Sequence, residues 1–419
     1  MRIAISGASG YIGQHLSSFL EGKGYDVIPL GRDLFKEDCF DELCRCVESC
    51  EVVINLAGAS INKRWTEAYK QELYDSRICV TRQLVHAINT RSVKLELFIS
   101  ASAVGYYPAF GEYDEYHDCR GMDFLARLCG TWEEEASACS SDVRLVITRF
   151  GVVLSEDGGA LKEMLRLQRF SRVSVVIGNG QQSFPWISLF DLCRSFGYII
   201  RNRQMRGVVN LVSPDLITQK QLAHTLARAD KIRRIIPLPE FFFRLKFGEG
   251  ASFVTKGQTV HPSKLQESGF TYIYPTIEKL MNITDHHTVP ELDVKRYMGR
   301  WYEIARYENH FERGMTDVTA TYTLLPDGKI RVENEGYKGG VHKKATGRAK
   351  QPDPKNNPGK LKVAFFLWFY ADYQYAVIGS STDKYLWILS RERNLPEAVR
   401  EDLLGKITER GYDISKLIS

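Results

Sequence analysis

The period of the hydrophobic residues changes once along the chain, near residue 290. Before this point, short apolar runs of strand length alternate with segments whose apolar residues recur at helical spacing, which is typical of a parallel sheet covered by helices. Beyond it the period changes to two, as in 301–307, where Trp301, Glu303, Ala305 and Tyr307 alternate with Tyr302, Ile304 and Arg306, which is typical of strands. The strands expected before the change are residues 2–6, 26–30, 51–58 and 97–102, and the helices 11–20 and 66–89.

The last third of the chain carries the signals of an all-β domain. Thr319–Leu324 and Lys329–Glu335 are strand-like and are joined by a Pro326-Asp-Gly328 turn. Pro396 then opens a helix with an apolar stripe, which ends at Gly411. Further strands are expected at 361–366, 373–378 and 385–389. Several short strands followed by one helix predict a barrel with the helix packed on its outside.

These patterns divide the 419 residues into two domains. We expect an α/β domain over residues 1–283, whose substrate part starts at about 151, and a barrel domain over residues 291–419. The segment between them, 284–290, is short and polar and ends in a proline, which suits a linker.

Composition and charge exclude several classes of protein. Hydrophobic residues make up 44% and charged residues 26% of the chain, as in a globular protein. The net charge of +5 is spread evenly, since residues 284–419 hold 22 Lys and Arg against 19 Asp and Glu, so nothing favours nucleic acid as a partner. No apolar run is long enough for a transmembrane segment. The nine cysteines are odd in number, which predicts free thiols and a cytoplasmic location. We expect no metal site, because no set of four suitably spaced ligands is present. A homodimer stays open.

The first strand runs into a glycine turn, Gly7-Ala-Ser-Gly10-Tyr-Ile-Gly13, and the turn runs into a helix. Glycines at these places permit a tight turn and a close approach of the backbone to a pyrophosphate, which then lies at the positive end of the helix dipole. The order strand, turn, helix and second strand therefore predicts a dinucleotide site.

The second strand ends in Gly31-Arg32-Asp33, which bears on the choice between NAD and NADP. An NAD site places an acidic residue there to bind the ribose 2′-hydroxyl, whereas Arg32 can pair with a 2′-phosphate. Arg32 therefore favours NADP. Asp33 can take the acidic role if the strand end shifts by one residue, so the alternative stays open.

The first domain resembles an extended short-chain dehydrogenase/reductase with an α/β Rossmann-type doubly wound sheet, and within it the NAD-dependent epimerase/dehydratase family. The motifs are Ser6–Gly13, Asn55–Gly58, Ser100–Ser102, Ser102–Tyr107, Arg149–Leu154 and Phe184–Ile187. The resemblance implies an NADP(H) cofactor bound by Gly7, Ser9, Gly10, Tyr11, Ile12 and Gly13 at the pyrophosphate, Gly31 and Arg32 at the adenosine phosphate, Leu56, Ala57 and Gly58 beside the adenosine and ribose, and Glu72, Arg77 and Val153 on segments that face the cofactor.

The catalytic pair of the superfamily, a Tyr four residues before a Lys, is missing from residues 1–283. The Lys of that pair lowers the pKa of the phenol so that it can exchange a proton. The catalytic candidates are therefore Ser102 and Tyr106, with Tyr107 as a further donor. Aromatic packing is an equal alternative for both tyrosines.

The second domain resembles a lipocalin of the bacterial lipocalin and apolipoprotein D-like branch. Gly299-Arg-Trp301 and Leu386-Trp-Ile-Leu-Ser-Arg391 carry this resemblance. It implies an eight-stranded lipocalin barrel in which Gly299, Trp301 and Arg391 are structural, with the Arg packed over the Trp in a cation–π contact. It also implies a lipophilic ligand in the barrel, such as a fatty acid or a lysophospholipid-like molecule.

These expectations combine into an NADP(H)-dependent oxidoreductase or epimerase-like enzyme fused to a lipocalin. The alternative is a catalytically inactive NADP-binding domain that serves as a redox sensor or scaffold for a lipid carrier. Two independent activities on one chain are a third interpretation.

Overall fold

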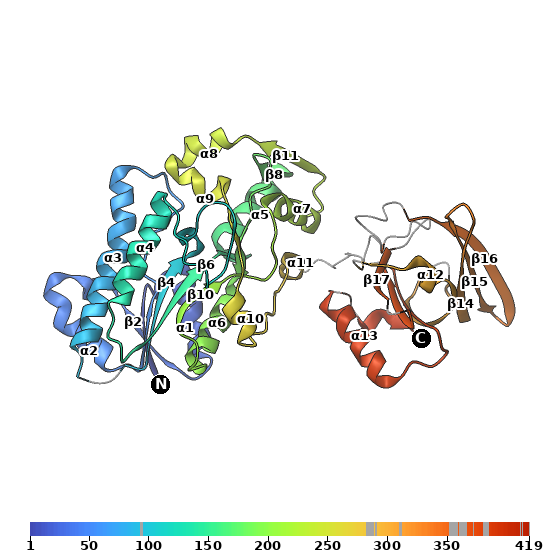
Figure 1. The fold of residues 1–419 in the computed structure, drawn as a ribbon, viewed down its shortest axis with the longest axis horizontal. Coiled ribbons are helices and arrows are strands. Elements are labelled where there is room, and N and C mark those ends of the chain that lie inside the picture. Colours follow the sequence, from blue (N-terminus) through green and yellow to red (C-terminus); the bar gives the residue numbers. More distant parts are fainter. Residues whose placement is uncertain are drawn as a thin grey trace. The chain divides into compact units, whose positions relative to one another are not determined.

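The chain divides into two compact units, Met1–Met281 and Asn282–Ser419, in a computed structural model. The structure describes residues 1–92, 95–281, 289, 291–309, 312–351, 359, 367–371, 373–379, 385–410, 412 and 414–418. The expected linker 284–290 lies, apart from residue 289, outside these residues. Each unit is described by itself (Figure 1).

The first unit is built on a six-stranded sheet in the order β10-β6-β4-β3-β1-β2, and every pair in it is parallel. The strands are β1 (Arg2–Ser6), β2 (Asp26–Leu30), β3 (Val52–Asn55), β4 (Leu97–Ala103), β6 (Arg144–Phe150) and β10 (Gly207–Leu211). The chain runs outward from β1 to β2 and then crosses over to β3. The carboxyl ends of β1 and β3 therefore meet where the order reverses, which is where ligands bind in such sheets.

Helices cover both faces of this sheet (Figure 1). On one face lie α1 (Tyr11–Glu21) and α6 (Leu189–Arg201), and on the other α2 (Phe40–Glu48), α3 (Glu67–Thr90) and α4 (Phe124–Ser137). Alternate residues of one strand feed the two cores, as Ile3 and Ile5 pack with α1 and α6 while Ala4 packs with α2 and α3. The expected doubly wound Rossmann-type sheet is confirmed.

The rest of the first unit consists of short helices and small two-stranded sheets. The sheets are β5 (Glu112–Tyr113) with β12 (Thr259–Val260), β7 (Val152–Ser155) with β9 (Trp186–Ser188), and β8 (Val173–Ile177) with β11 (Arg234–Leu238). The helices are α5 (Gly159–Ser171), α7 (Gln219–Ala229), α8 (Glu240–Phe247), α9 (Ser252–Thr255), α10 (Ser263–Glu267) and α11 (Ile277–Leu280).

The second unit is an antiparallel sheet in the order β16-β15-β14-β13-β19-β18-β17, with β20 paired to β13. Its strands are β13 (Gly299–Tyr307), β14 (Met315–Leu324), β15 (Ile330–Lys338), β16 (Val341–Ala349), β17 (Leu367–Ala371), β18 (Tyr375–Gly379), β19 (Leu386–Ser390) and β20 (Leu417–Ile418). Helix α12 (Val294–Tyr297) precedes the sheet, and α13 (Glu397–Glu409) packs on it through Leu403 and Ile407. The predicted strand 361–366 lies outside the described residues, so the closed eight-stranded barrel stays a prediction.

Candidate functional site

The glycine turn at the carboxyl end of β1 has the shape that a phosphate cradle needs. Gly7 has a φ of +75°, and a Cβ there would lie 2.8 Å from the backbone of Leu56. A Cβ on Gly13 would lie 2.2 Å from the carbonyl oxygen of Gly7. Helix α1 starts after Gly10 with no side chain capping its first amides. The backbone is therefore open at the positive end of the helix dipole, where an anion binds.

Buried hydrogen bonds around Asn55 hold the neighbouring turn after β3 in place. The hydroxyl of Ser6 donates to Oδ1 of Asn55 at 2.6 Å, and Nδ2 of Asn55 donates to the Thr81 hydroxyl at 2.7 Å. The amide of Ala57 donates to Oδ1 of Asn55 at 3.3 Å, which fixes the segment Leu56–Gly58 against β1. The two turns that the sequence assigned to the cofactor are thus brought side by side.

Arg77 stabilises this turn and is less available than the sequence suggested. Its guanidinium donates to the carbonyl oxygens of Ala59 at 3.0 Å and Leu73 at 3.1 Å. A Cβ on Gly58 would lie 2.9 Å from Cζ of Arg77, so this glycine makes room for the guanidinium. Burial lowers the pKa of Arg77. Glu72, on the same helix, is exposed.

At the end of β2 the structure separates the two residues between which the sequence left a choice. Asp33 is exposed and pairs with Lys36, whose hydrogen bond and charge lower the pKa of that carboxyl. Arg32 is exposed and makes no ion pair within the described part of the chain. The cation at this strand end is therefore free to bind, whereas the neighbouring carboxylate already has a partner.

Tyr11 and Val153 lie where α1 meets β7. A Cβ on Gly158 would be 2.3 Å from the Tyr11 ring, so the ring packs directly on the loop after β7. Val153 packs against the same core cluster. The Tyr11 hydroxyl is buried and has no hydrogen-bond partner among the described residues, a donor left over for a ligand. Together with the cradle that a Cβ would fill, this fits a dinucleotide: Gly7, Gly10 and Gly13 would hold its pyrophosphate and Arg32 its 2′-phosphate.

Ser102, one of the two catalytic candidates, belongs to a buried ionic cluster. Its hydroxyl donates to Oε1 of Glu133 at 2.6 Å. Arg149 binds the same carboxylate through Nε at 2.8 Å and Nη2 at 2.7 Å. The three residues are only 2%, 8% and 4% exposed. Burial lowers the pKa of Arg149, but the hydrogen bonds and charge of Glu133 outweigh burial and raise it.

Tyr106 lies at the edge of this cluster. Its ring lies under the guanidinium of Arg149, with Cζ 3.5 Å from the ring centroid, and its hydroxyl donates to Asp118 at 3.4 Å. Burial raises the pKa of Tyr106, whereas the Arg149 charge lowers it. Tyr106 is partly exposed, while the Ser102 hydroxyl is buried and engaged. Of the two candidates, Tyr106 is therefore the one able to reach a substrate.

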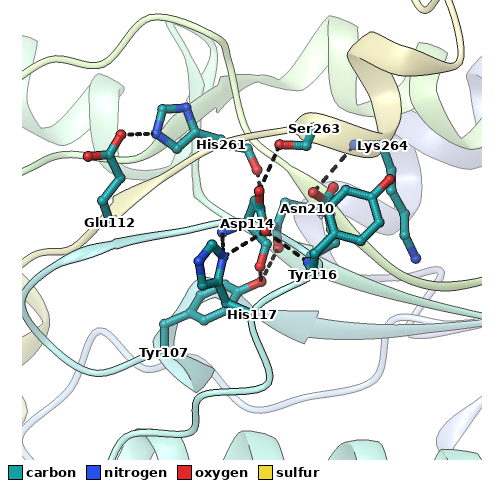
Figure 2. A network of polar contacts seen from close by, with 10 residues as sticks. Tyr107, Glu112, Asp114, Tyr116, His117, Asn210, His261, Ser263 and Lys264 are labelled. Carbon is teal, nitrogen blue, oxygen red and sulfur yellow. Dashed lines mark hydrogen bonds and ion pairs between the residues drawn. The ribbon is translucent and has the colours of Figure 1, made fainter.

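Tyr107 is the anchor of a polar network that holds this segment in place (Figure 2). Its hydroxyl lies 2.9 Å from the carbonyl oxygen of Asp114 and 3.1 Å from Oδ1 of Asn210. Asn210 in turn donates through Nδ2 to the carbonyl oxygen of His261 at 3.0 Å and through its amide to Glu115 at 2.8 Å. The Tyr107 hydroxyl is therefore buried and engaged by the protein.

Sequence reasoning missed Glu133 and Arg149. Register pairs Arg149 on β6 with Ser102 on β4, so the two side chains leave the sheet side by side. A signal was present, because an arginine closes the otherwise apolar and hydroxylic run Leu145-Val-Ile-Thr-Arg149 of a central strand. A charge at such a place is buried and requires a partner. The partner comes from a helix, and sequence spacing does not identify it.

In the second unit, Arg391 closes one end of the sheet. Its guanidinium lies 3.8 Å above the ring of Trp301 and donates to the carbonyl oxygens of Arg296, Tyr297, Met298, Arg300 and Tyr373. Gly299 has a φ of +99°, and a Cβ there would lie 3.2 Å from Nη1 of Arg391. Trp301 is fully buried, and its Nε1 donates to the carbonyl oxygen of Tyr297 at 2.9 Å. These residues act as a lid on the core.

The same unit holds a cavity of about 70 Å³. Its lining is Glu303, Glu312, Val318, Ala320, Tyr322, Val332, Asn334, Ile378, Trp387 and Leu389. Apolar walls with a few convergent polar groups are typical of a small-molecule site, and the volume here is large enough for a small head group only, since ligand pockets usually measure roughly 300–1,000 Å³. Over the described residues, there is no cluster of three or more His, Cys, Asp or Glu able to hold a metal, and no helix has the length and apolarity to cross a membrane.

Comparison with known proteins gives separate matches for the two units. Residues 3–211 match the NAD dependent epimerase/dehydratase family, residues 238–282 a domain of unknown function, DUF1731, and residues 292–419 the lipocalin-like domain. Epimerase family protein SDR39U1 of Mus musculus is 33% identical over 285 residues, which cover 66% of this chain and 97% of the relative. Epimerase family protein YfhF of Bacillus subtilis is 34% identical over 307 residues, covering 69% and 100%.

One of the similar solved structures contains NADPH. The crystal structure of human epimerase family protein SDR39U1, isoform 2, with NADPH matches with a TM-score of 0.62 and 32% identity, covering 67% of this chain and 98% of that chain. Both resemblances inferred from the motifs are confirmed.

Proposed function

Because the chain belongs to the epimerase family through its first unit and carries a lipocalin-like domain in its second, we propose that it is an NADP(H)-dependent oxidoreductase or epimerase-like enzyme whose second unit binds a lipophilic ligand. One observation carries the cofactor half of this proposal. The open glycine turn at Gly7–Gly13 lies one strand away from Arg32, which is without an ion pair among the described residues. The relative solved with NADPH supports the same nucleotide.

Tyr106 carries the catalytic half. Bound NADPH would supply a hydride, and the chain must then supply a proton to the oxygen that is reduced. Tyr106 is the partly exposed phenol next to the buried cation Arg149. Burial keeps the pKa of Tyr106 above its ordinary value, and the charge of Arg149 offsets part of this rise. Arg149 is a positioning residue here, since its hydrogen bonds go to Glu133. It replaces part of what the missing lysine does.

The cofactor proposal is tested by titrating the full chain with NADPH and NADH and following the nucleotide fluorescence. We expect NADPH to bind at least about tenfold tighter than NADH, and Arg32→Ala to remove that preference. Arg45→Ala is the matched control, because Arg45 is an exposed arginine on α2 away from the turn. Equal binding of both nucleotides by the wild type would contradict the assignment of Arg32, and no binding of either would overturn the oxidoreductase proposal.

A second candidate function is a redox sensor that binds the nucleotide without turning it over. The absence of Tyr-x-x-x-Lys from residues 1–283 favours it. NADPH oxidation with a panel of lipophilic aldehydes and ketones separates the two functions. Turnover in the wild type, lost in Tyr106→Phe while NADPH affinity is kept, supports the enzyme. Tight NADPH binding with no turnover of any carbonyl supports the sensor.

A further inference from the structure

Two carboxylate side chains are part of the lining of the cavity in the second unit. Glu303 and Glu312 both line it, together with apolar side chains such as Val332 and Ile378. The side chain of Glu303 is only 6% exposed. A buried carboxylate needs hydrogen-bond donors or a cation, because leaving water without them is costly. The partners of these two carboxylates therefore show what the cavity lacks.

Glu303 is paired with Arg306, but this cation lies behind the carboxylate. Nη1 of Arg306 binds Oε1 of Glu303, and Nη2 donates to the carbonyl oxygens of Glu312 at 3.1 Å and Met315 at 3.2 Å. Arg306 is not among the residues that line the cavity. The protein thus engages both Nη atoms, while Nε of Arg306 is buried without a hydrogen-bond partner among the described residues. An anionic ligand in the cavity would meet carboxylates before it met the guanidinium.

Among the described residues, the donors to the side chain of Glu312 are neutral. Its Oε2 accepts hydrogen bonds from Nδ2 of Asn309 at 2.7 Å and from Nε1 of Trp387 at 2.9 Å. Over the described residues, Oε1 of Glu312 and Oε2 of Glu303 accept no hydrogen bond from the protein. Each of the two carboxylates therefore has one acceptor oxygen left at the cavity.

The charges of the cluster formed by Glu303, Glu312 and Arg306 also favour a cation in the cavity. Burial and, after it, the charge of Glu312 raise the pKa of Glu303 to about 7, against the opposing charge and hydrogen bond of Arg306. Within the described part of this unit, the charged and titratable groups that face the cluster are these three and Tyr322, whose pKa burial also raises. With both carboxylates ionised, the cluster has an excess of one negative charge over Arg306. A cation in the cavity would balance it.

We propose that this cavity binds the cationic head group of an amphiphile, a protonated amine, with the first carbons of its chain against the aliphatic walls, since about 70 Å³ is roughly the volume of a few water molecules. The inference rests on the proposed lipophilic ligand of the second unit and specifies its chemistry. It departs from the fatty-acid expectation, because a carboxylate head would add a third negative charge beside Glu303 and Glu312. An ammonium group has three donors, enough for the free oxygens of both residues.

The test compares three ligands with the same tail. Octylamine, octanol and octanoate are titrated into the full chain by calorimetry at pH 8 and pH 6, below their aggregation concentrations. We expect octylamine to bind at least about tenfold tighter than octanoate at pH 8, since a charge-assisted hydrogen bond in a buried site discriminates by that factor. The preference should shrink at pH 6, because Glu303 is then protonated and must release its proton to the solvent when the amine binds.

Variants connect the preference to the cavity. Glu303→Gln keeps the shape and an acceptor for Arg306, and is expected to bring octylamine and octanoate within about threefold of each other. Glu401→Gln is the matched control, an exposed glutamate on α13. Octanol and octanoate binding as tightly as octylamine, or an amine preference that survives in Glu303→Gln, would overturn the inference while the lipophilic-ligand proposal stands. No binding of any of the three would overturn both.

Discussion

Each of the two units buries a glutamate against an arginine, and the two pairs differ in what surrounds them. In the first unit, Glu133 takes two hydrogen bonds from Arg149 and a third from Ser102. In the second unit, Glu303 takes one from Arg306 and faces a second carboxylate across a cavity. The first pair is complete within the protein. In the second pair, Oε2 of Glu303 is left to accept a hydrogen bond from a ligand.

This difference separates a structural ion pair from a binding site. A buried pair whose hydrogen bonds are all made fixes its elements together, here β4, β6 and helix α4, and offers a ligand nothing. A buried pair with an added like charge keeps a net charge and a repulsion between the two like groups. A ligand of opposite charge removes this repulsion when it binds. Burial of charge alone therefore does not identify function, but unmatched burial of charge does.

Breaking the complete pair should have the largest effect. Arg149→Met leaves Glu133 buried with one donor, and we expect the first unit to lose about 3–5 kcal/mol of its free energy of unfolding. Urea-dependent hydrogen exchange of peptides from β4 and β6 measures this unit separately from the second. The double variant Glu133→Gln, Arg149→Met should recover part of the loss. A loss below about 1 kcal/mol would show that water reaches the pair, as at a surface ion pair.

The incomplete pair should make the second unit sensitive to pH. The pKa of Glu303 is raised in the folded protein from its ordinary 4.5 to about 7. A raised carboxyl pKa means that the folded state binds the proton more tightly than the unfolded chain does. The contribution of protonated Glu303 to the free energy of unfolding is therefore full below pH 4.5. It is lost as the pH rises through 7, by on the order of 2–3 kcal/mol.

Hydrogen exchange in peptides from β13 and β19 between pH 5 and pH 8, corrected for intrinsic exchange rates, follows this loss. Glu303→Gln should make the free energy of unfolding nearly independent of pH over this range, because it removes the titrating group. Glu401→Gln should behave as the wild type does. A wild-type unit whose stability is flat or rises with pH would contradict the assignment of an unmatched carboxylate.

The sequence predicted backbone features better than side-chain partners. The parallel sheet and the glycine turn follow from hydrophobic period and from backbone sterics, which are local properties, so Gly7 and Gly13 lie where they were expected. Arg391 lies over Trp301, because both residues belong to motifs whose spacing is fixed by two neighbouring strands.

The two buried pairs show where sequence reasoning stopped. Glu133 comes to Arg149 from helix α4, and Glu312 comes to the cavity from a turn before β14, so tertiary packing alone brings each to its partner. Because the Tyr-x-x-x-Lys pair is missing, the sequence makes Ser102 a catalytic candidate. Its hydroxyl is instead used by Glu133, a contact that no spacing in the sequence indicates.

Ser102→Ala is the smallest and the most discriminating change in the complete pair. It removes one of three hydrogen bonds to the Glu133 carboxylate, so we expect a loss of about 1.5 kcal/mol from the free energy of unfolding of the first unit. NADPH affinity and any carbonyl turnover should stay within about twofold of wild type if Ser102 is structural. Ser137→Ala is the control, since that exposed hydroxyl donates to the backbone carbonyl of Glu133 and not to its carboxylate. Turnover lost with stability intact would instead return Ser102 to the catalytic role and would mean that the first pair, too, is open to a substrate.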